Sequence, residues 1–574
     1  MHYAMPYKRL FIPALCITIS LSVLSIVRPL LISKALNEVV SNSGAGSQLN
    51  YFSTLILVFL LLESGLQVIN ARLSSLLGQN IVKDLRLQVY KHILQLKNTY
   101  FDKTPVGTLV TRAISDIESL SEVFTEGFIV IAGDLLMLLI FISVMLYTNW
   151  VLALLALSTI PLLFVATALF KKGIKKTFTE VRNAVAALNT FTQEHLSGMR
   201  LVQLFNREKQ EMDTFKSINA KHRDANIRSI FYYSVFFPVV EILSSVSIAL
   251  VIWFAGVKGN TYNIGLGDIT FFVMMVNMMF RPIRMLADRL NTLQMGFVSA
   301  ERVFVVLDTN EKINNTGQAI FQKVQHEIRF KDVWFAYKEE EYVLKGLSFD
   351  IRAGETLALV GATGAGKTSV INLLNRFYEI NKGEISIDGS NVRDYTLSSL
   401  RTGIAVVLQE VHLFNDSILN NITLNNPEFS RTDVLKATKE MGLMDYIDSL
   451  PGGFDFQVRE RGAGLSAGQR QLVAFIRAYV HQPKLFVLDE ATASIDTPTE
   501  LLIQKAIQKV SEGRTSIIIA HRLSTIRHVN KILLIENGKV EEQGTLNELL
   551  NMNGKFKRLY DMQFALEELK EDKH

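Results

Sequence analysis

The chain has 574 residues, of which 49% are hydrophobic and only 20% are charged, and its formal net charge is +5. This length and apolar composition argue against a purely soluble protein, so we expect membrane-embedded and soluble domains in one chain. The basic residues are spread over connecting segments, which argues against nucleic acid as a partner. The single cysteine, Cys16, excludes an intramolecular disulfide.

Six apolar runs in the first part of the chain are long enough to cross a membrane, which takes about 20 residues. The expected spans lie near 10–36, 52–71, 127–147, 150–171, 232–256 and 269–288. No small-residue cleavage site closely follows the first run, so we expect it to remain as a span. Lys and Arg precede this run and are frequent in the connectors 72–126 and 172–231. The positive-inside rule therefore predicts that both termini and these two connectors are cytosolic.

The two basic connectors are too long and too helix-periodic to be simple loops. We expect the spans to continue beyond the membrane as amphipathic helices that turn back near 101–116 and 194–206.

Three acidic residues, Glu63, Asp134 and Glu241, lie within or near the edges of the predicted spans. Ionisable groups are costly in a membrane and often functional, so they indicate a cavity that accepts cations. The alternative is that each pairs with a neighbouring polar group or lies at the interface. The sixth span also contains Met274, Met275, Met278 and Met279. These side chains either form an adaptable lining for apolar ligands or pack against other helices.

Beyond about residue 306 the apolar runs shorten to strand length and are separated by Gly, Asp and Glu. The expected strands include 328–335, which alternates like a half-exposed strand, and the buried runs 356–360, 484–488 and 515–520. Helical segments between them indicate an α/β fold. The predicted domains are an all-α domain of six spans with long cytosolic helical extensions at 1–305, a linker at 306–325 and an α/β domain at 326–574.

Residues 361–368 read Gly-Ala-Thr-Gly-Ala-Gly-Lys-Thr and match the phosphate-loop pattern G-x-x-x-x-G-K-[ST], between a buried strand and a helical segment. The glycines let backbone N–H groups turn toward phosphate oxygens, and the helix N-terminus adds positive potential. We expect Lys367 to reach the terminal phosphates of ATP and Thr368 to ligate Mg²⁺. The expected phosphate-binding residues are Gly361, Ala362, Thr363, Gly364, Ala365, Gly366, Lys367, Thr368 and Ser369.

The apolar run 485–488 ends in two carboxylates, Asp489 and Glu490. In phosphoryl-transfer sites such a pair puts one acid on Mg²⁺ and leaves the next near the γ-phosphate. We assign Asp489 to the metal and Glu490 to the attacking water. The alternative for two acids at a strand end is ordinary surface charge.

Residues 465–471, Leu-Ser-Ala-Gly-Gln-Arg-Gln, resemble the signature sequence of ATP-binding cassette (ABC) proteins. Other positions follow in the family's order. Gln409 resembles the family's glutamine after a core strand, and Tyr337 resembles the aromatic residue that stacks on adenine. Asp496 resembles the aspartate of its dimer-interface loop, and His521 resembles its switch histidine. The family's most frequent signature has glycine where this chain has Ala467. We expect this difference to cause little loss of function.

The resemblance implies an exporter-type helical transmembrane domain followed by a P-loop nucleotide-binding domain, with ATP and Mg²⁺ as cofactors. It implies that Glu490, His521 and Gln409 act in hydrolysis, and that Gln409 also touches Mg²⁺. In this family the signature helix faces the γ-phosphate held by a second subunit. Here the signature residues are Ser466, Ala467, Gly468 and Gln469. Short helices at the tips of the extensions dock into the nucleotide-binding domains, one of them into the partner's.

The function implied by the resemblance is ATP-driven export of hydrophobic or amphipathic small molecules by a dimer of half-transporters, identical or related. A lipid flippase is the first alternative, and an ATP-gated channel or regulatory subunit is the second. The fused domain order disfavours an importer. No transit peptide is recognisable, and the layout suits a bacterial plasma membrane with the ATPase domain in the cytosol.

Overall fold

The computed structural model describes residues 2–41, 46–123, 129–459, 462–489, 496–520 and 523–562. The chain divides into two compact units. The first, the helical unit, comprises Met1–Leu94 and Val106–Asn310, and the second, the sheet unit, comprises Gln95–Pro105 and Glu311–His574. The short segment Gln95–Pro105 therefore belongs to the sheet unit, although helices of the helical unit precede and follow it in the chain.

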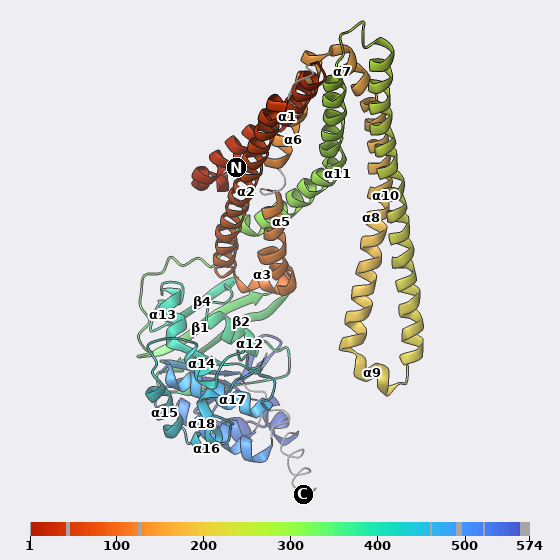
Figure 1. Ribbon diagram of the computed structural model, residues 1–574. Helices are drawn as coiled ribbons and strands as arrows, with labels where there is room; N and C mark the ends of the chain where they lie inside the picture. The colour runs from red at the N-terminus through yellow and green to blue at the C-terminus, as the bar shows by residue number, and fades with distance from the viewer. Residues whose placement is uncertain are drawn as a thin grey trace. The chain divides into compact units, whose positions relative to one another are not determined.

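The described part of the helical unit consists of helices and their connections (Figure 1). They are a 3₁₀ helix (His2–Tyr7), α1 (Lys8–Ser41), α2 (Gly46–Ile93), α4 (Val106–Thr111), a π-helical turn (Arg112–Asp116), α5 (Ile117–Glu122), α6 (Ile129–Thr148), α7 (Trp150–Leu157), α8 (Ile160–Ser197), α9 (Met199–Leu204), α10 (Glu208–Lys258) and α11 (Leu266–Asp308). Six helical stretches of the described chain are long and apolar enough to cross a membrane: Met5–Glu38, Gln48–Ile93, Val130–Thr148, Trp150–Ser197, Glu208–Lys258 and Leu266–Met285. The prediction of six spans is confirmed.

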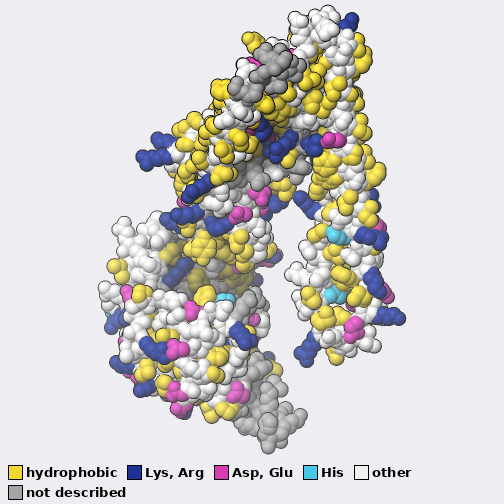
Figure 2. Space-filling view, viewed as in Figure 1, with side chains coloured by type: hydrophobic (Ala, Val, Ile, Leu, Met, Phe, Trp, Pro, Cys, Tyr) yellow, Lys and Arg dark blue, Asp and Glu magenta, His cyan; other side chains and the backbone are white. Residues whose placement is uncertain are grey.

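α8 and α10 lie side by side as a long hairpin, with the short helix α9 at its end (Figure 1). At a rise of 1.5 Å per residue, α10 is on the order of 75 Å long, more than twice the roughly 30 Å of a hydrocarbon core. On the face seen in Figure 2, hydrophobic side chains dominate one half of the hairpin, whereas Lys and Arg gather toward the α9 end. These two helices therefore continue well beyond any membrane that they cross.

The sheet unit contains two sheets. Its strands are β1 (Glu327–Ala336), β2 (Tyr342–Arg352), β3 (Thr356–Val360), β4 (Lys382–Ile387), β5 (Ser390–Asn391), β6 (Ile404–Val407), β7 (Leu485–Asp489), β8 (Thr515–Ile519), β9 (Lys531–Glu536) and β10 (Lys539–Gly544). The antiparallel sheet has the order β2-β1-β4-β5, and the second sheet has the order β10-β9-β3-β8-β7-β6. In the second sheet all neighbours are parallel except β10 and β9. An α/β fold follows the helical unit, as predicted.

The described helices of the sheet unit have at most 15 residues. They are α3 (Asn98–Lys103), α12 (Lys367–Leu374), α13 (Leu397–Gly403), α14 (Ile418–Thr423), α15 (Arg431–Glu440), α16 (Met444–Asp448), a 3₁₀ turn (Gly453–Asp455), α17 (Ala467–Val480), α18 (Thr497–Ser511), α19 (Leu523–Ile526) and α20 (Leu546–Asn551).

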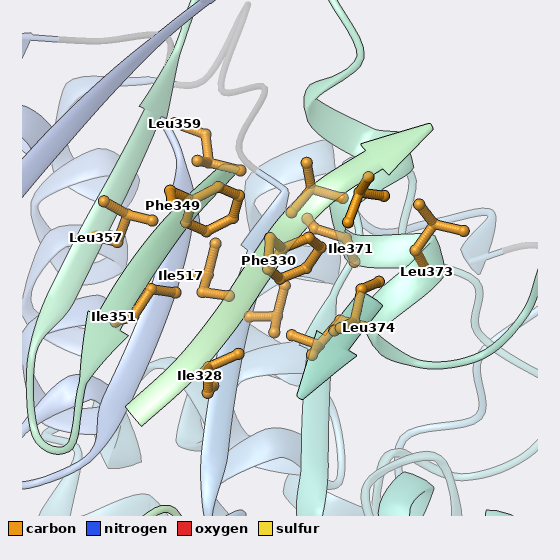
Figure 3. Close-up of a cluster of buried hydrophobic side chains, with 14 of the residues drawn as sticks. Ile328, Phe330, Phe349, Ile351, Leu357, Leu359, Ile371, Leu373, Leu374 and Ile517 are labelled. Atoms are coloured by element: carbon orange, nitrogen blue, oxygen red, sulfur yellow. The ribbon is translucent and has the colours of Figure 1, made fainter. Parts of the chain in front are cut away.

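One core cluster joins the two sheets through α12 (Figure 3). The rings of Phe330 on β1 and Phe349 on β2 stack with their centroids 4.5 Å apart. Ile371 and Leu374 of α12 are buried in the same cluster and lie close to Phe330 in Figure 3. The helix that follows the predicted phosphate loop is therefore held by the apolar core, because its buried face cannot leave without exposing these side chains to water.

Candidate nucleotide-binding site

The predicted site residues gather where the parallel strands of the second sheet end. β3 ends at Val360, immediately before the predicted phosphate loop, and β7 ends with Asp489. Only β8 separates these two strands in the sheet. Since parallel strands end at a common edge, the loop and the carboxylate come from one side of the sheet, the usual place for a ligand in an α/β fold.

At two glycines of the phosphate loop, both the backbone angle and the surrounding atoms exclude a side chain. Gly361 and Gly366 have φ angles of +152° and +103°. A Cβ atom at Gly361 would lie 2.1 Å from the carbonyl oxygen of Ile535 on β9, and one at Gly366 would lie 2.6 Å from the side chain of Leu344. Without side chains the loop packs tightly and turns directly into α12, whose first residue is Lys367. Its first-turn N–H groups have no partner within the helix and suit an anion.

Lys367 is folded over the loop that precedes it. Its Nζ donates hydrogen bonds to the carbonyl oxygens of Gly361, at 2.7 Å, and Ala362, at 2.9 Å. The residue is 6% exposed. Burial lowers the pKa of Lys367, and the nearby Asp489 carboxylate partly opposes this shift. A phosphate beside Nζ would favour its charged form in the same way, so the loop is arranged for an anionic ligand.

Thr368 and Asp489 supply a pair of oxygen ligands. The Thr368 hydroxyl donates to the Asp489 carboxylate across 3.3 Å, and Asp489 is 7% exposed. A hydroxyl and a buried carboxylate are hard oxygen donors, which are the ligands that Mg²⁺ prefers. Gln409, two residues after the end of β6, is exposed to solvent. The residues present therefore fit a magnesium ion.

Tyr337 is brought to α12 by the strand that precedes it. The register of β1 is irregular between Phe330 and Val333, after which alternate residues again face the core. The Tyr337 hydroxyl lies 3.1 Å from Ser369 Oγ and accepts a hydrogen bond from Asn372 Nδ2 at 3.2 Å. The residue is 38% exposed. The structure thus joins Tyr337 to the helix of the phosphate loop.

Asn372 is a contact of Tyr337 that the sequence analysis missed. It lies three residues after Ser369 on α12, so both side chains share one helix face. This three-residue spacing could have indicated from the sequence that Asn372, like Ser369, lies near Tyr337.

The signature residues form a capping box at the start of α17. Ser466 Oγ accepts a hydrogen bond from the backbone N–H of Gln469 at 3.2 Å, and Gln469 Oε1 accepts from the N–H of Ser466 at 2.8 Å. Ala467 is the first residue of the helix, and Gly468 is buried. No hydrogen bond within the described chain joins residues 466–469 to residues 361–369. The signature residues therefore cap their own helix and make no such bond to the phosphate loop of the same chain.

Asp496 is the N-cap of α18. Its carboxylate accepts hydrogen bonds from the hydroxyl of Thr499, at 2.8 Å, and from the N–H of the same residue, at 3.1 Å. These bonds lower the pKa of Asp496, the side-chain bond most. Two further predicted site residues, Glu490 and His521, lie outside the described residues.

The acidic residues of the predicted spans have polar partners. Asp134 on α6 forms an ion pair with Arg289 on α11. Glu241 on α10 lies 3.1 Å from Arg284 on α11. Glu63 accepts a hydrogen bond at 3.4 Å from a glutamine one turn along α2. The structure thus favours the alternative of neighbouring partners over a cavity built to accept cations, because two of the three charges are already balanced.

An open hollow of about 790 Å³ lies on the helical unit beside the Glu241–Arg284 pair. Its wall includes the apolar side chains of Phe237, Ile242 and Val246 on α10, together with the two charged residues. An apolar surface next to an ion pair suits molecules that have both an apolar and a charged part.

Met275 and Met279 are not part of that hollow. Both are fully buried in the core of the helical unit, where they pack with Phe272 and Val276. For these two methionines the packing alternative is correct.

Family models match both parts of the chain, "ABC transporter transmembrane region" at residues 11–283 and "ABC transporter" at residues 344–493. An uncharacterized ABC transporter ATP-binding protein of Bacillus subtilis, YknV, is 35% identical over 98% of this chain and 94% of its own length. A second B. subtilis relative, YknU, is 33% identical over 98% of this chain and 96% of its own length. An ATP-dependent lipid A-core flippase of Syntrophus aciditrophicus is 33% identical over 95% of this chain and 89% of its own length.

These matches agree with the geometry above: six candidate spans in one unit, and in the other a phosphate loop with its lysine, a strand-end aspartate and a signature helix. The half-transporter layout points to association with a second half-transporter. The chain therefore belongs to the ABC transporter family, as a multi-pass membrane protein that binds ATP and couples its hydrolysis to transport.

Proposed function

We propose that two copies of this chain form an exporter that moves amphipathic molecules, either lipids or drug-like compounds, across a bacterial plasma membrane. The observation that carries the proposal is the hollow beside Glu241 and Arg284, which combines an apolar wall with a charged pair. Such a surface offers burial to a hydrocarbon part and a counter-charge to a headgroup. The flippase name of several relatives supports lipids as one class of cargo.

The roles of the site residues are part of the proposal. Tyr337 would stack on adenine, and residues 361–369 would hold the phosphates. Thr368, Gln409 and Asp489 would hold Mg²⁺, which when bound offsets negative charge on the phosphate oxygens. Glu490 would orient the attacking water, and His521 and Gln409 would contact the terminal phosphate and the water.

The second copy would complete each site with Ser466, Ala467, Gly468 and Gln469, and Asp496 would lie at the dimer interface. The N-terminus of the signature helix supports this arrangement, because its positive potential suits a phosphate and no hydrogen bond within the described chain joins it to the phosphate loop of the same chain. Both ATP-binding domains would face the cytosol, where the basic connectors also lie by the positive-inside rule.

The proposed cycle is alternating access. ATP favours the state in which the two sheet units are closed on each other, because its phosphates contact both chains only in that state. Hydrolysis removes this preference and lets the helical units reopen toward the cytosol. Export then follows from the difference in ATP affinity between the two states.

The test compares wild type with Glu490→Gln, each purified and reconstituted in phosphatidylethanolamine–phosphatidylglycerol vesicles. We expect hydrolysis to fall by roughly 10²–10⁴-fold while ATP binding persists, because the water loses its carboxylate acceptor. ATP-driven movement of a fluorescent phospholipid or a cationic dye should stop as well. Glu512→Gln, which alters an exposed carboxylate paired with Lys509, is the matched control. Undiminished transport by Glu490→Gln would refute the proposal.

The same vesicles separate the alternatives. A flippase moves the fluorescent phospholipid but not the dye, and a drug exporter moves the dye. An ATP-gated channel gives flux that continues in Glu490→Gln as long as ATP is bound, because gating requires no turnover.

A further inference from the structure

The short helix α3 is attached to the sheet unit by its backbone. The N–H of Lys97 donates to the carbonyl oxygen of Glu311 at 2.8 Å, and Leu96 forms a β-bridge with Lys312. Leu96 is 6% exposed. In the chain this segment directly follows α2, which carries the second span. Only residues 94–97 therefore separate α3 from a membrane helix along the polypeptide.

Tyr378 makes a side-chain contact with α3. Its hydroxyl donates a hydrogen bond of 2.8 Å to the carboxylate of Asp102. Burial of the ring, and next this hydrogen bond, raise the pKa of Tyr378. The hydroxyl therefore stays protonated, and remains a donor, throughout the physiological pH range.

The ring of Tyr378 also touches Tyr337. The two ring centroids are 5.0 Å apart with an interplanar angle of 85°, and Phe335 packs against both rings. Edge-to-face aromatic pairs of this kind have a preferred geometry, so rotation of one ring disturbs the next. An adenine stacked on Tyr337 would fix that ring and, through it, the position of Tyr378.

Tyr378 follows a residue, Arg376, that is held by hydrogen bonds, and a cavity lies beside the Tyr378 ring. Arg376, 3% exposed, donates to the carbonyl oxygen of Asn314 at 2.9 Å and to Glu379 at 3.1 Å. A cavity of about 160 Å³ is lined by Tyr378, Phe335 and Thr99, among others. This partly open cavity gives the ring room to shift against α3.

We propose that Tyr378 is a positioning residue that transmits occupancy of the base site at Tyr337 to α3, through ring contact on one side and the hydrogen bond to Asp102 on the other. The inference rests on the proposed function, in which Tyr337 holds the adenine. It goes further by making the response of α3 depend on the base as well as on the phosphates.

The test is hydrogen exchange of residues 95–105 in the full-length protein in lipid. A non-hydrolysable ATP analogue should slow exchange of this segment in wild type by about fivefold or more, a typical coupling between linked sites. Inorganic tripolyphosphate, which can fill the phosphate loop but has no base, should slow it far less. Tyr378→Phe keeps the ring and removes the hydroxyl, so it should bind the analogue with near wild-type affinity and lose most of the protection.

Two further variants test the hydrogen bond itself. Asp102→Asn keeps a carbonyl acceptor and should retain part of the protection, whereas Asp102→Ala should behave like Tyr378→Phe. The double variant Tyr378→Phe/Asp102→Ala should lose no more of the protection of residues 95–105 than either single variant does, because both substitutions remove the same contact. Tyr479→Phe is the matched control, since Tyr479 donates a similar hydrogen bond of 2.9 Å to Glu440 elsewhere in the sheet unit.

The outcomes separate the inference from the function on which it rests. If the wild-type protein binds the analogue but hydrogen exchange of residues 95–105 is not slowed, the inference is overturned and the proposed function stays intact. Equal protection by tripolyphosphate, unchanged protection in Tyr378→Phe, or an equal loss in Tyr479→Phe would also overturn it. Protein that neither binds nor hydrolyses ATP would refute both.

Discussion

The short helices α3 and α9, one at each turning point, differ in how much apolar surface they leave uncovered. At α3, Leu96 is 6% exposed and Asp102 is hydrogen-bonded to the sheet unit. At α9, Leu201, Leu204 and Phe205 are 61%, 76% and 66% exposed. A cluster of large apolar side chains on a polar hairpin end is unusual unless another surface covers it. The difference indicates that the sheet unit supplies the contact for α3, whereas the described residues of the helical unit leave α9 uncovered.

The turn that contains α9 is nevertheless stabilised by side-chain contacts. The ring of His195 stacks on Phe191 with centroids 3.8 Å apart, and its Nε2 lies 2.9 Å from a carboxylate oxygen of Glu211. The second of these contacts joins α8 to α10 directly beside α9. The apolar surface is thus held in a fixed shape, which lowers the cost of binding another surface. In the proposed dimer, that surface is the partner's sheet unit.

The largest expected effect comes from placing a charge on this surface with Leu204→Asp. The variant should fold, because the side chain is exposed, but a carboxylate buried without a partner in the dimer should weaken docking by tenfold or more. Transport and cargo-stimulated hydrolysis in vesicles should fall accordingly.

The control for this variant is Met552→Asp, because Met552 is 63% exposed but lies after α20, far along the chain from α9. If Leu204→Asp transports as well as this control does, the α9 surface is not a docking site and the comparison of the two ends loses its functional meaning.

A smaller effect is expected at the covered end from Leu96→Ala. Truncation of a buried leucine costs about 2–5 kcal/mol, and here that cost should appear locally as looser attachment of α3. Exchange of residues 95–105 should accelerate, while the thermal midpoint of the sheet unit changes little. Leu94→Ala is the matched control, since Leu94 is 68% exposed two residues earlier. Equal exchange in both variants would show that Leu96 does not anchor the segment.

The parts of the site that local spacing encodes were predictable from sequence. The loop from Gly361 to Thr368 carries its own glycines and lysine, and Asp489 directly ends an apolar strand. The capping box of Ser466 and Gln469 is likewise a short-range pattern. Each of these features needs only neighbouring residues, so the sequence alone contains the information.

Contacts between distant parts of the chain were not predictable in this way. Tyr378 and Asp102 are 276 positions apart, and nothing near either residue marks the other as its partner. The pairing of Glu241 with Arg284 depends on how α10 and α11 pack, so hydropathy gave only the choice between a cation cavity and a paired charge. Sequence spacing specifies elements and local motifs, whereas tertiary packing decides which polar groups neutralise each other.

The smallest effect is expected from Glu211→Gln. This substitution weakens the contact between His195 and Glu211 beside α9 and leaves the apolar surface of α9 unchanged. The pair between Glu211 and His195 is partly exposed, with side chains 23% and 26% accessible, so its loss should cost about 1 kcal/mol or less. Asp213→Asn, which breaks the exposed pair with Lys216 on the same helix, is the control. Exchange near residues 195–211 should rise only in Glu211→Gln, and transport should fall less than in Leu204→Asp. A loss as large as that of Leu204→Asp would mean that the shape of the turn, more than its apolar surface, determines docking.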